Sequence, residues 1–406
     1  MKTLNNKIHS TNTSINRPDE TPVITSRRNL LKMIGAGLAV LSVPMGSSIA
    51  FAAAQTPRPK IVWVILRGAL DSLHTIIPTT DKQYKQLRPK LSSSFKAPLL
   101  PLDKRFALHP ALSNLHQWYQ EKALTPVVAV SSGYQRRSHF DGQDFLETGL
   151  ADIDYDNGWL ARAIDVKNKR ALAVSRATPI SLRSSEQVNT WYPSNLKSAD
   201  DDIYQALSTL YQQDEVLQTA LAKGLEVKDM VMDKQKKKTR KQGKFIDLTK
   251  ACAKLMTGEK GVDCAMLELG GWDTHNNQAN RLNSKLTELD EGLAQLRAGL
   301  ADDWQNTVII VATEFGRTAK ENGTLGTDHG TGSALLLAGG ALKGGIVKGN
   351  WPGLAEHELF EKRDLMPTSD SFSWIASVLA QHWQFSEQEL KQVFPQVTAY
   401  DHSLIK

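Results

Sequence analysis

Two pairs of a carboxylate and an imidazole in this chain could bind a metal or transfer a proton. Asp273 and His275 follow two consecutive glycines, and Asp328 and His329 lie in a second glycine-rich stretch. Glycine lets the backbone bend sharply and approach a ligand closely, and carboxylates with imidazoles on such loops serve as metal ligands or acid–base groups. One such pair alone would be interpreted as a turn or a helix cap. Because two pairs occur, we expect them to share one site.

Each pair follows a stretch that is predicted to be a strand. Residues 308–312 form a continuous apolar run rich in β-branched side chains, which is typical of a strand buried on both faces of a parallel sheet. Glu314 comes just after this run, and a second apolar run, residues 264–269, ends shortly before Asp273. Open α/β sheets bind ligands at the carboxyl ends of their strands. The carboxylates and imidazoles are therefore predicted to lie along that edge.

The first predicted strand, residues 60–66, leads in the same way to Arg67 and Asp71. Further strands are expected at residues 126–130, 171–174 and 334–338, and helices at residues 108–119, 200–232, 282–300 and 371–381. Strands and helices alternate along the chain. The predicted fold class is therefore α/β, with a doubly wound, mostly parallel central sheet flanked by helices.

Ser138 is a candidate of another kind. It precedes His139 and is followed three residues later by Asp141. One interpretation is a helix cap. The other is a nucleophile or anion site at a helix N-terminus, where free amides and the helix dipole favour negative charge. Arg136, together with Arg137, would suit a phosphate or sulfate group. The sequence leaves both interpretations open.

The composition of the 406 residues is that of a globular protein, with 41% hydrophobic and 23% charged residues. The net charge is +6, but residues 1–54 hold six basic and two acidic side chains. Residues 234–244 hold seven more basic side chains and no acid. They are expected to be a solvated loop or helix end within a variable helical, Lys-rich insertion near residues 200–245. Without this run the body is slightly acidic, so no broad nucleic-acid surface is predicted.

The N-terminal segment has the features of a targeting signal. Arg27 and Arg28 form a twin-arginine pattern, an apolar stretch follows at residues 33–45, and small residues suited to cleavage lie at residues 47–54. The apolar stretch is shorter than the roughly 20 residues that a membrane span needs. We expect residues 1–54 to be a signal peptide that is removed, with the twin-arginine translocation machinery as a partner. Residues 55–406 would then be a periplasmic or secreted domain without a stable membrane span.

A series of motifs resembles those of the domain-of-unknown-function 1501 family. The motifs are L-R-G-A-L-D-S-L at residues 66–73, S-H-F-D-G-Q-D at 138–144, G-W-D-T-H-N-N-Q at 271–278, T-E-F-G-R-T at 313–318 and E-N-G-T-L-G-T-D-H-G at 321–330. The resemblance covers essentially all of residues 55–406, in the family's order. Ser72 stands where the family usually has glycine, which is a small residue as well.

That family is grouped with the alkaline phosphatase and sulfatase superfamily, so the resemblance implies an alkaline phosphatase-like fold. It also implies one or two divalent metals at the carboxyl ends of strands, and a Ser, Thr or modified Cys nucleophile that acts on phosphate or sulfate esters. By this resemblance Asp71 takes the place of the metal-binding Asp of the first strand, and Ser138 lies near the nucleophile's position. Asp273 and His275 resemble a metal-binding Asp and His, and His329 resembles the late metal-binding His.

The strand predicted at residues 308–312 departs from the superfamily's pattern. Where the superfamily has Ser-Asp-His-Gly, this chain has Thr-Glu-Phe-Gly at residues 313–316. Glu314 can still bind a metal, but the phenyl ring of Phe315 has no lone pair to offer. One metal site would be complete while a second lacks its imidazole, unless His139 supplies a nitrogen from another loop.

Two functions from different classes follow as hypotheses. The first is an exported metal-dependent hydrolase of phosphate or sulfate esters, with Ser138 and His139 as catalytic residues and a small anionic ester or glycan as ligand. Its metal is expected to be zinc, with calcium, magnesium or manganese as alternatives. The proposed metal ligands are Asp71, Asp273, His275, Glu314, Asp328 and His329, and the anion-binding residues are Arg67, Arg136 and Arg317. The second hypothesis, which Phe315 favours, is a non-catalytic exported protein of the same fold that binds an envelope component, a glycan or a partner protein.

Overall fold

The computed structural model describes residues 58–193, 201–231 and 244–406. The expected signal peptide with Arg27 and Arg28, and all but the last residue of the basic run at residues 234–244, lie outside the described residues. Within the part of the chain that is described, we find no helix whose length and apolar character would let it span a bilayer.

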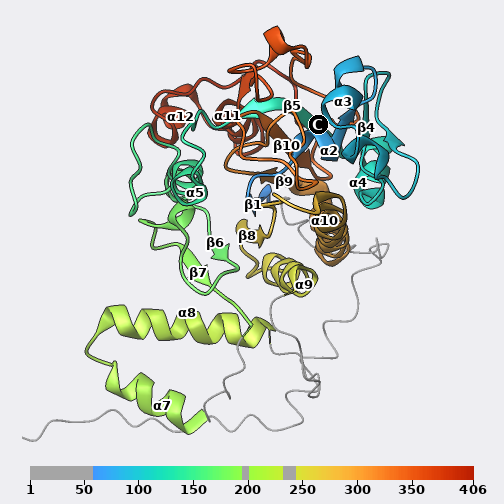
Figure 1. Cartoon of the computed structure of the whole chain (residues 1–406). Helices are drawn as coiled ribbons and strands as arrows, with labels where there is room; N and C mark the ends of the chain where they lie inside the picture. The colour runs from blue at the N-terminus through green and yellow to red at the C-terminus, as the bar shows by residue number, and fades with distance from the viewer. Residues whose placement is uncertain (1–57, 194–200, 232–243) are drawn as a thin grey trace, which may run out of the picture. The chain divides into compact units, whose positions relative to one another are not determined.

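The described residues form a central sheet of eight strands (Figure 1). In spatial order the strands are β11 (Ser369–Asp370), β5 (Leu124–Ser131), β10 (Ser333–Ala338), β9 (Thr307–Ala312), β1 (Lys60–Arg67), β8 (Cys264–Gly270), β6 (Ala171–Ala173) and β7 (Val188–Thr190). The neighbours β5–β11, β9–β1, β1–β8, β8–β6 and β6–β7 pair in parallel, and β10 is antiparallel to both of its neighbours. The predicted mostly parallel sheet is confirmed.

The antiparallel direction of β10 follows from how it is connected to β9. A parallel neighbour requires the chain to cross back to the other end of the sheet, usually through a helix. Residues 313–332 contain no helix and fold as loops, with a bridge between Arg317 and His329. The chain therefore stays at the carboxyl edge of β9, and β10 starts from that edge. This long connection at one edge supplies much of the candidate site.

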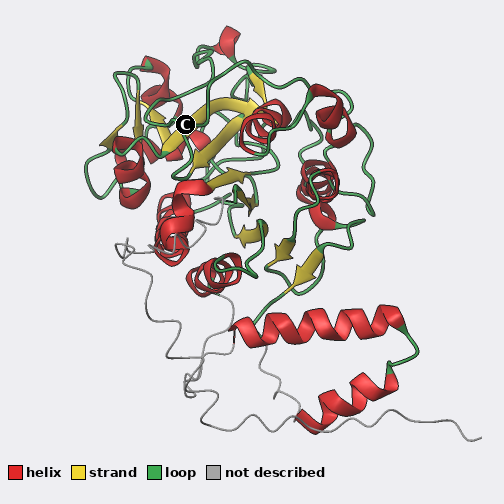
Figure 2. Cartoon of the chain, turned by 180° about the vertical axis from the view of Figure 1, so that it is seen from behind, coloured by secondary structure: helices red, strands yellow, loops and turns green. Residues whose placement is uncertain are grey.

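Helices cover both faces of the sheet (Figures 1 and 2). One core contains side chains of α4 (Ser113–Gln120), α9 (Phe245–Met256) and α10 (Gln278–Leu300). The other contains side chains of α5 (His139–Thr148), α6 (Trp159–Val166), α11 (Ser371–His382) and α12 (Glu387–Val393). Successive residues of β1 alternate between the two cores, because strand side chains point to opposite faces. Both faces are buried, which explains the continuous apolar runs.

Smaller elements complete the described structure. A second sheet pairs β2 (Ile76–Pro78) with β4 (Phe106–Leu108), and β4 with β3 (Leu100–Pro101), next to the short helices α2 (Ser72–Thr75) and α3 (Lys82–Leu87). The helix expected from residue 108 begins only at Ser113, because residues 106–108 pair as β4. The single helical stretch expected near residues 200–232 is two helices, α7 (Asp201–Leu210) and α8 (Glu215–Val231).

Candidate metal centre

Loops and one helix end bring four side chains together at the carboxyl edge of the sheet. His139 is the first residue of α5, Asp273 and His275 follow β8, and His329 lies in the connection between β9 and β10. His139, Asp273 and His329 each offer one ligand atom, and these three atoms lie within 4.8 Å of one another. His275 borders this set through Asp273 and His329. We call these four residues the centre.

The side chains of the centre meet through three Nε2 atoms and one carboxylate oxygen. Nε2 of His329 lies 2.9 Å from Nε2 of His139 and 3.0 Å from Nε2 of His275. Oδ1 of Asp273 lies 2.9 Å from Nε2 of His275, 3.3 Å from that of His329 and 3.4 Å from that of His139. Imidazole nitrogens and carboxylate oxygens are the donors that bind zinc and similar ions.

The Nδ1 atom of each histidine in the centre faces an acceptor outside it. The contacts are His139 with Oε1 of Glu314 at 2.7 Å, His275 with Oδ1 of Asp328 at 3.1 Å, and His329 with the carbonyl oxygen of Arg137 at 2.9 Å. A neutral imidazole carries one proton, and an acceptor at Nδ1 holds the proton there. With the proton at Nδ1, the Nε2 lone pairs point toward one another and toward Oδ1 of Asp273, an arrangement that a bound cation would satisfy. The residues present therefore fit a divalent metal, with outer hydrogen bonds of the kind that orient metal-binding histidines.

Glu314 lies behind His139 and not among the Nε2 atoms. Its side chain is fully buried. Besides His139, Oε1 accepts hydrogen bonds from the backbone N–H groups of Gly68 at 2.7 Å and Ala69 at 3.1 Å. The hydroxyl of Thr313 lies 2.8 Å from Oε2. The carboxylate is thus surrounded by donors, and it orients the imidazole of His139.

Glu314 and Asp328, both predicted to be metal ligands, do not lie among the meeting donor atoms in this structure. Each carboxylate supports a histidine from behind, Glu314 for His139 and Asp328 for His275. Gly68 makes the close packing behind the centre feasible: its φ is +121°, and a Cβ atom there would lie 2.5 Å from the backbone nitrogen of Asp273.

Arg317 lies against Asp273 and is buried. It donates to Oδ1 of Asp273 at 2.5 Å, and its other contacts are the backbone carbonyls of Gly68, Ala69, Trp272 and Thr327. Burial alone would raise the pKa of Asp273, but the charge and hydrogen bond of Arg317 hold that pKa below its usual value. The donors of Arg317, which was predicted to bind an anionic ligand, are engaged by Asp273 and by these carbonyls. It fixes the loops that carry the centre.

Burial, followed by the charge of His139, lowers the pKa of His329 below its usual value. The neutral imidazole is thereby favoured over the imidazolium. Since a histidine must be neutral to bind a metal, this environment suits the donor role of His329.

Phe315 is buried, and its ring packs against the imidazole of His139. The two rings stack with centroids 4.9 Å apart and an angle of 23° between their planes. The start of α5 thus places the imidazole of His139 beside Phe315, just after the end of β9. The sequence showed a histidine in S-H-F-D but gave no means of placing it, because His139 and its partner Glu314 are 175 residues apart.

The structure does not bring Asp71, a predicted metal ligand, into the centre. Nη1 of Arg88 lies 2.8 Å from each carboxylate oxygen, and Asp71 also accepts from the backbone N–H of His74 and the side-chain amide of Gln278. Burial would raise the pKa of Asp71, but Arg88 outweighs burial and lowers it. This carboxylate is buried, paired with Arg88 and hydrogen-bonded, which offsets the cost of burying its charge.

The other predicted residues lie around α5. Ser138 is the N-cap residue of α5, yet its side chain makes no capping hydrogen bond to the described part of the chain. Arg67 lies 3.7 Å from Glu268 and over the exposed ring of Phe140 at 5.4 Å, and its side chain is 40% exposed. Arg136 is exposed. Arg67 and Arg136 thus remain accessible to solvent.

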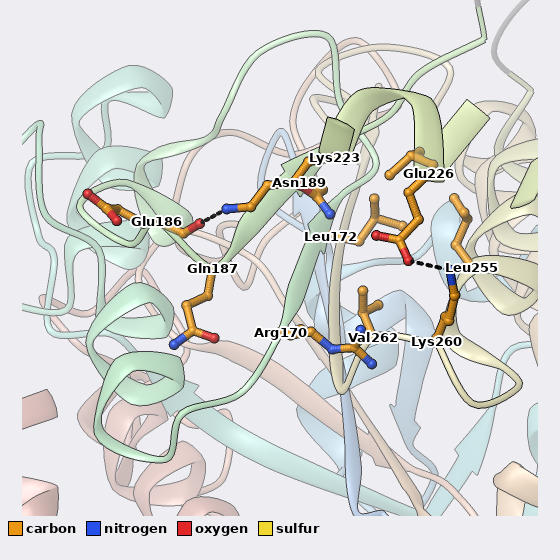
Figure 3. A pocket seen from close by; sticks show the side chains of 11 residues that line it. Arg170, Leu172, Glu186, Gln187, Asn189, Lys223, Glu226, Leu255, Lys260 and Val262 are labelled. Carbon is orange, nitrogen blue, oxygen red and sulfur yellow. Dashed lines mark hydrogen bonds and ion pairs between the residues drawn. The ribbon is translucent and has the colours of Figure 1, made fainter. Parts of the chain in front are cut away.

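A cavity of about 300 Å³ lies elsewhere, between β6, β7, α8 and α9 (Figure 3). Its charged side chains are largely engaged: Lys223 donates to the carbonyl oxygen of Glu186 at 2.9 Å, and Lys260 pairs with Glu226 at 3.2 Å. None of its lining residues belongs to the centre. The converging donor atoms of the centre, and not this cavity, therefore define the candidate functional site.

The chain matches one family in sequence. The family described as "Protein of unknown function (DUF1501)" matches residues 129–394, which include all four residues of the centre. Among curated proteins, none matches the chain in sequence.

Solved structures with a similar arrangement have low sequence identity. The structure of alkaline phosphatase from the Antarctic bacterium TAB5 is 13% identical, with a TM-score of 0.35, and the match covers 71% of this chain and 95% of that one. The zinc complex of the C-terminal periplasmic domain of EcEptC from Escherichia coli is 10% identical, with a TM-score of 0.34, covering 70% and 73%. Ps i-CgsB in complex with k-i-k-neocarrahexaose is 12% identical, with a TM-score of 0.40, covering 82% and 74%.

Proposed function

We propose that this chain, which belongs to the DUF1501 family, is a metal-dependent hydrolase of phosphate or sulfate esters. The proposal rests on the geometry of the centre. The observation that carries this proposal is the meeting of histidine Nε2 atoms with Oδ1 of Asp273, each histidine being held at Nδ1 by an acceptor. We propose zinc as the metal, because imidazole suits zinc whereas calcium and magnesium prefer oxygen ligands.

His139, Asp273 and His329 are the proposed first ligands, since their donor atoms lie within 4.8 Å of one another. His275 would add a further nitrogen from the side of Asp328. A metal held there would act as a Lewis acid that polarises the ester oxygen and stabilises the charge that develops on it.

Ser138 is the proposed nucleophile. It directly precedes His139, and its hydroxyl is not committed to a helix-capping bond within the described structure. The free N–H groups in the first turn of α5 favour an anionic group at this position. Arg67 and Arg136, which are accessible, would add positive charge for a phosphate or sulfate group.

The test is the metal content of the purified full chain, followed by activity on a panel of phosphate and sulfate esters. We expect about one bound zinc per chain and hydrolysis of one ester class. Asp273→Asn removes the only carboxylate of the centre. It should weaken zinc binding by more than the roughly 10–100-fold that loss of an outer hydrogen bond costs, and should lower activity accordingly.

Asp401→Asn is the matched control, because Asp401 is an exposed carboxylate in the C-terminal segment, and it should change neither property. The opposite result is a wild-type chain without divalent metal or esterase activity and an unaffected Asp273→Asn variant. That result would favour the non-catalytic binding protein instead.

We also propose that the chain is exported through the twin-arginine translocation machinery, with residues 1–54 as the signal. The support is the pair Arg27 and Arg28 followed by a short apolar stretch. In a bacterial host, the wild-type chain should be recovered from the periplasm or medium without its first ~54 residues. Replacement of both arginines by lysine should retain it, uncleaved, in the cytoplasm; equal export of both forms would contradict the proposal.

A further inference from the structure

Gln278, the first residue of α10, joins two loops of the centre through its side-chain amide. Its Oε1 atom accepts hydrogen bonds from the hydroxyls of Thr274 at 3.0 Å and Thr327 at 2.7 Å. Its Nε2 group donates to Oδ2 of Asp71. Asp71, Gln278, Thr274 and Thr327 are all buried. We call these four residues the hub.

The chemistry of the partners fixes the orientation of the Gln278 amide. Asp71 is paired with Arg88, and its ionised carboxylate can only accept hydrogen bonds. The Nε2 group must therefore face Asp71, which leaves Oε1 to accept from the two hydroxyls. Each threonine hydroxyl donates its single proton to Oε1 of Gln278. The ion pair between Asp71 and Arg88 thus determines the direction of the side-chain hydrogen bonds that Gln278 makes in the hub.

The hydroxyls are placed where they can control the centre. Thr274 stands between Asp273 and His275, and Thr327 stands two residues before His329. The backbone N–H of Thr327 also donates to the carbonyl oxygen of Thr274 at 3.3 Å. The hub therefore joins the loop that carries His275 to the loop that carries His329.

We propose that Asp71, Gln278, Thr274 and Thr327 are positioning residues that hold His275 and His329 in the orientation in which their Nε2 atoms meet. As far as a metal is concerned, this inference rests on the proposed function. In this role Asp71, which follows β1, acts on the centre indirectly, through its hydrogen bond with Gln278.

The test replaces each hub threonine with valine, which keeps the shape and removes the hydroxyl. Thr274→Val and Thr327→Val should each weaken zinc binding by the full chain about 10–100-fold, measured by competition with a chelator. Thr274→Ser and Thr327→Ser keep the hydroxyl and should bind zinc nearly as the wild type does. The matched control is Thr249→Val in α9, where a buried threonine hydroxyl donates to the carbonyl oxygen of Ile246 at 3.1 Å.

A second readout does not need a metal. In the metal-free full chain, the imidazole NMR signals of His275 and His329 should move in the valine variants and stay unchanged in Thr249→Val. If a valine variant fails to fold, Thr→Ala at the same position removes the hydroxyl with less bulk and takes its place in both measurements.

The outcomes separate this inference from the proposed function. Unchanged zinc affinity together with unmoved histidine signals in the valine variants would overturn the positioning role. A wild-type chain that binds no zinc would overturn the proposed function. In that case histidine signals that move only in the hub variants would still support the positioning role, and unmoved signals would overturn it.

Discussion

Asp273 and Glu314 have the same functional group, but their surroundings give them different tasks. Asp273 is part-exposed, and its Oδ1 atom is open to three imidazoles as well as to Arg317. Glu314 is fully buried and receives hydrogen bonds from backbone amides and from a hydroxyl. The first can therefore serve as a ligand, and the second can only influence the centre through His139.

At the scale of single residues, we predict that Glu314→Gln weakens zinc binding about tenfold. The side chain can keep Oε1 toward the amides of Gly68 and Ala69, so the change mainly removes the negative charge behind His139. A carboxylate at Nδ1 makes the imidazole a stronger ligand, and losing such a partner costs about 10–100-fold in affinity. The measurement is the zinc dissociation constant by chelator competition.

The control for this change is Glu121→Gln. Glu121 is exposed and pairs with Arg297 at 2.7 Å, and its replacement should leave the zinc dissociation constant unchanged. Equal zinc affinity of wild type and Glu314→Gln would mean that Glu314 does not tune His139.

At the scale of elements, the strands could be predicted because each leaves a complete signal in its own few residues. Strand β9 is buried throughout, β1 is buried except at Arg67, and β8 is buried except at Glu268 and Gly270. Their apolar runs end within one residue of the ends of the strands. The carboxyl edge followed from the parallel order. The antiparallel direction of β10 could not be predicted in this way, because it depends on residues 313–332 staying at one edge of the sheet.

The partners of the site residues could not be predicted for a different reason. A carboxylate after a strand gives the same sequence signal whether it binds a metal, orients a histidine or neutralises a buried arginine. Asp71 pairs with Arg88, Glu314 contacts His139, and Asp273 is the proposed ligand beside Arg317; the partners are 17, 175 and 44 residues away in sequence. The sequence thus placed Asp273, His275 and His329 at one edge but could not distinguish ligands from their supports.

The packing of α2 against the small sheet leads to a prediction about pH. His74 is buried and stacks on Phe95, and its Nε2 atom has no hydrogen-bond partner among the described residues. Burial lowers the pKa of His74 to about 3, an effect that Asp71 opposes and Arg88 strengthens. Its pKa in the unfolded chain is about 6.5. The stability contributed by neutral His74 is therefore present above pH ~6.5 and is lost as the pH falls toward 3.

Between pH 7 and pH 5, protonation of His74 in the unfolded chain should lower the free energy of unfolding by about 2 kcal/mol. His74→Phe cannot titrate, so its free energy of unfolding should fall by about that much less over the same range. Urea unfolding at the two pH values measures the difference. His357→Phe, at an exposed histidine, should keep the wild-type pH dependence. An identical dependence in His74→Phe would show that His74 is not kept neutral by folding.

At the scale of the whole molecule, the centre joins segments that are distant in the chain. His139 comes from α5, Asp273 and His275 from the loop after β8, and His329 from the connection between β9 and β10. A metal that binds these donors only when they are assembled stabilises the folded chain as a whole, because the unfolded chain cannot present them together.

We therefore predict that zinc raises the melting temperature of the full chain and that a chelator reverses the rise. At a free zinc concentration of 100 times the dissociation constant, the gain in stability is about 2.7 kcal/mol. In a domain of this size that gain corresponds to a rise of several degrees. His329→Ala removes the imidazole that contacts both other histidines, so its melting temperature should no longer respond to zinc. His357→Ala should respond as the wild type does, because this exposed histidine lies outside the centre. A response to zinc that is the same in wild type and His329→Ala would place the stabilising metal outside the centre, because the variant lacks the imidazole that contacts both other histidines.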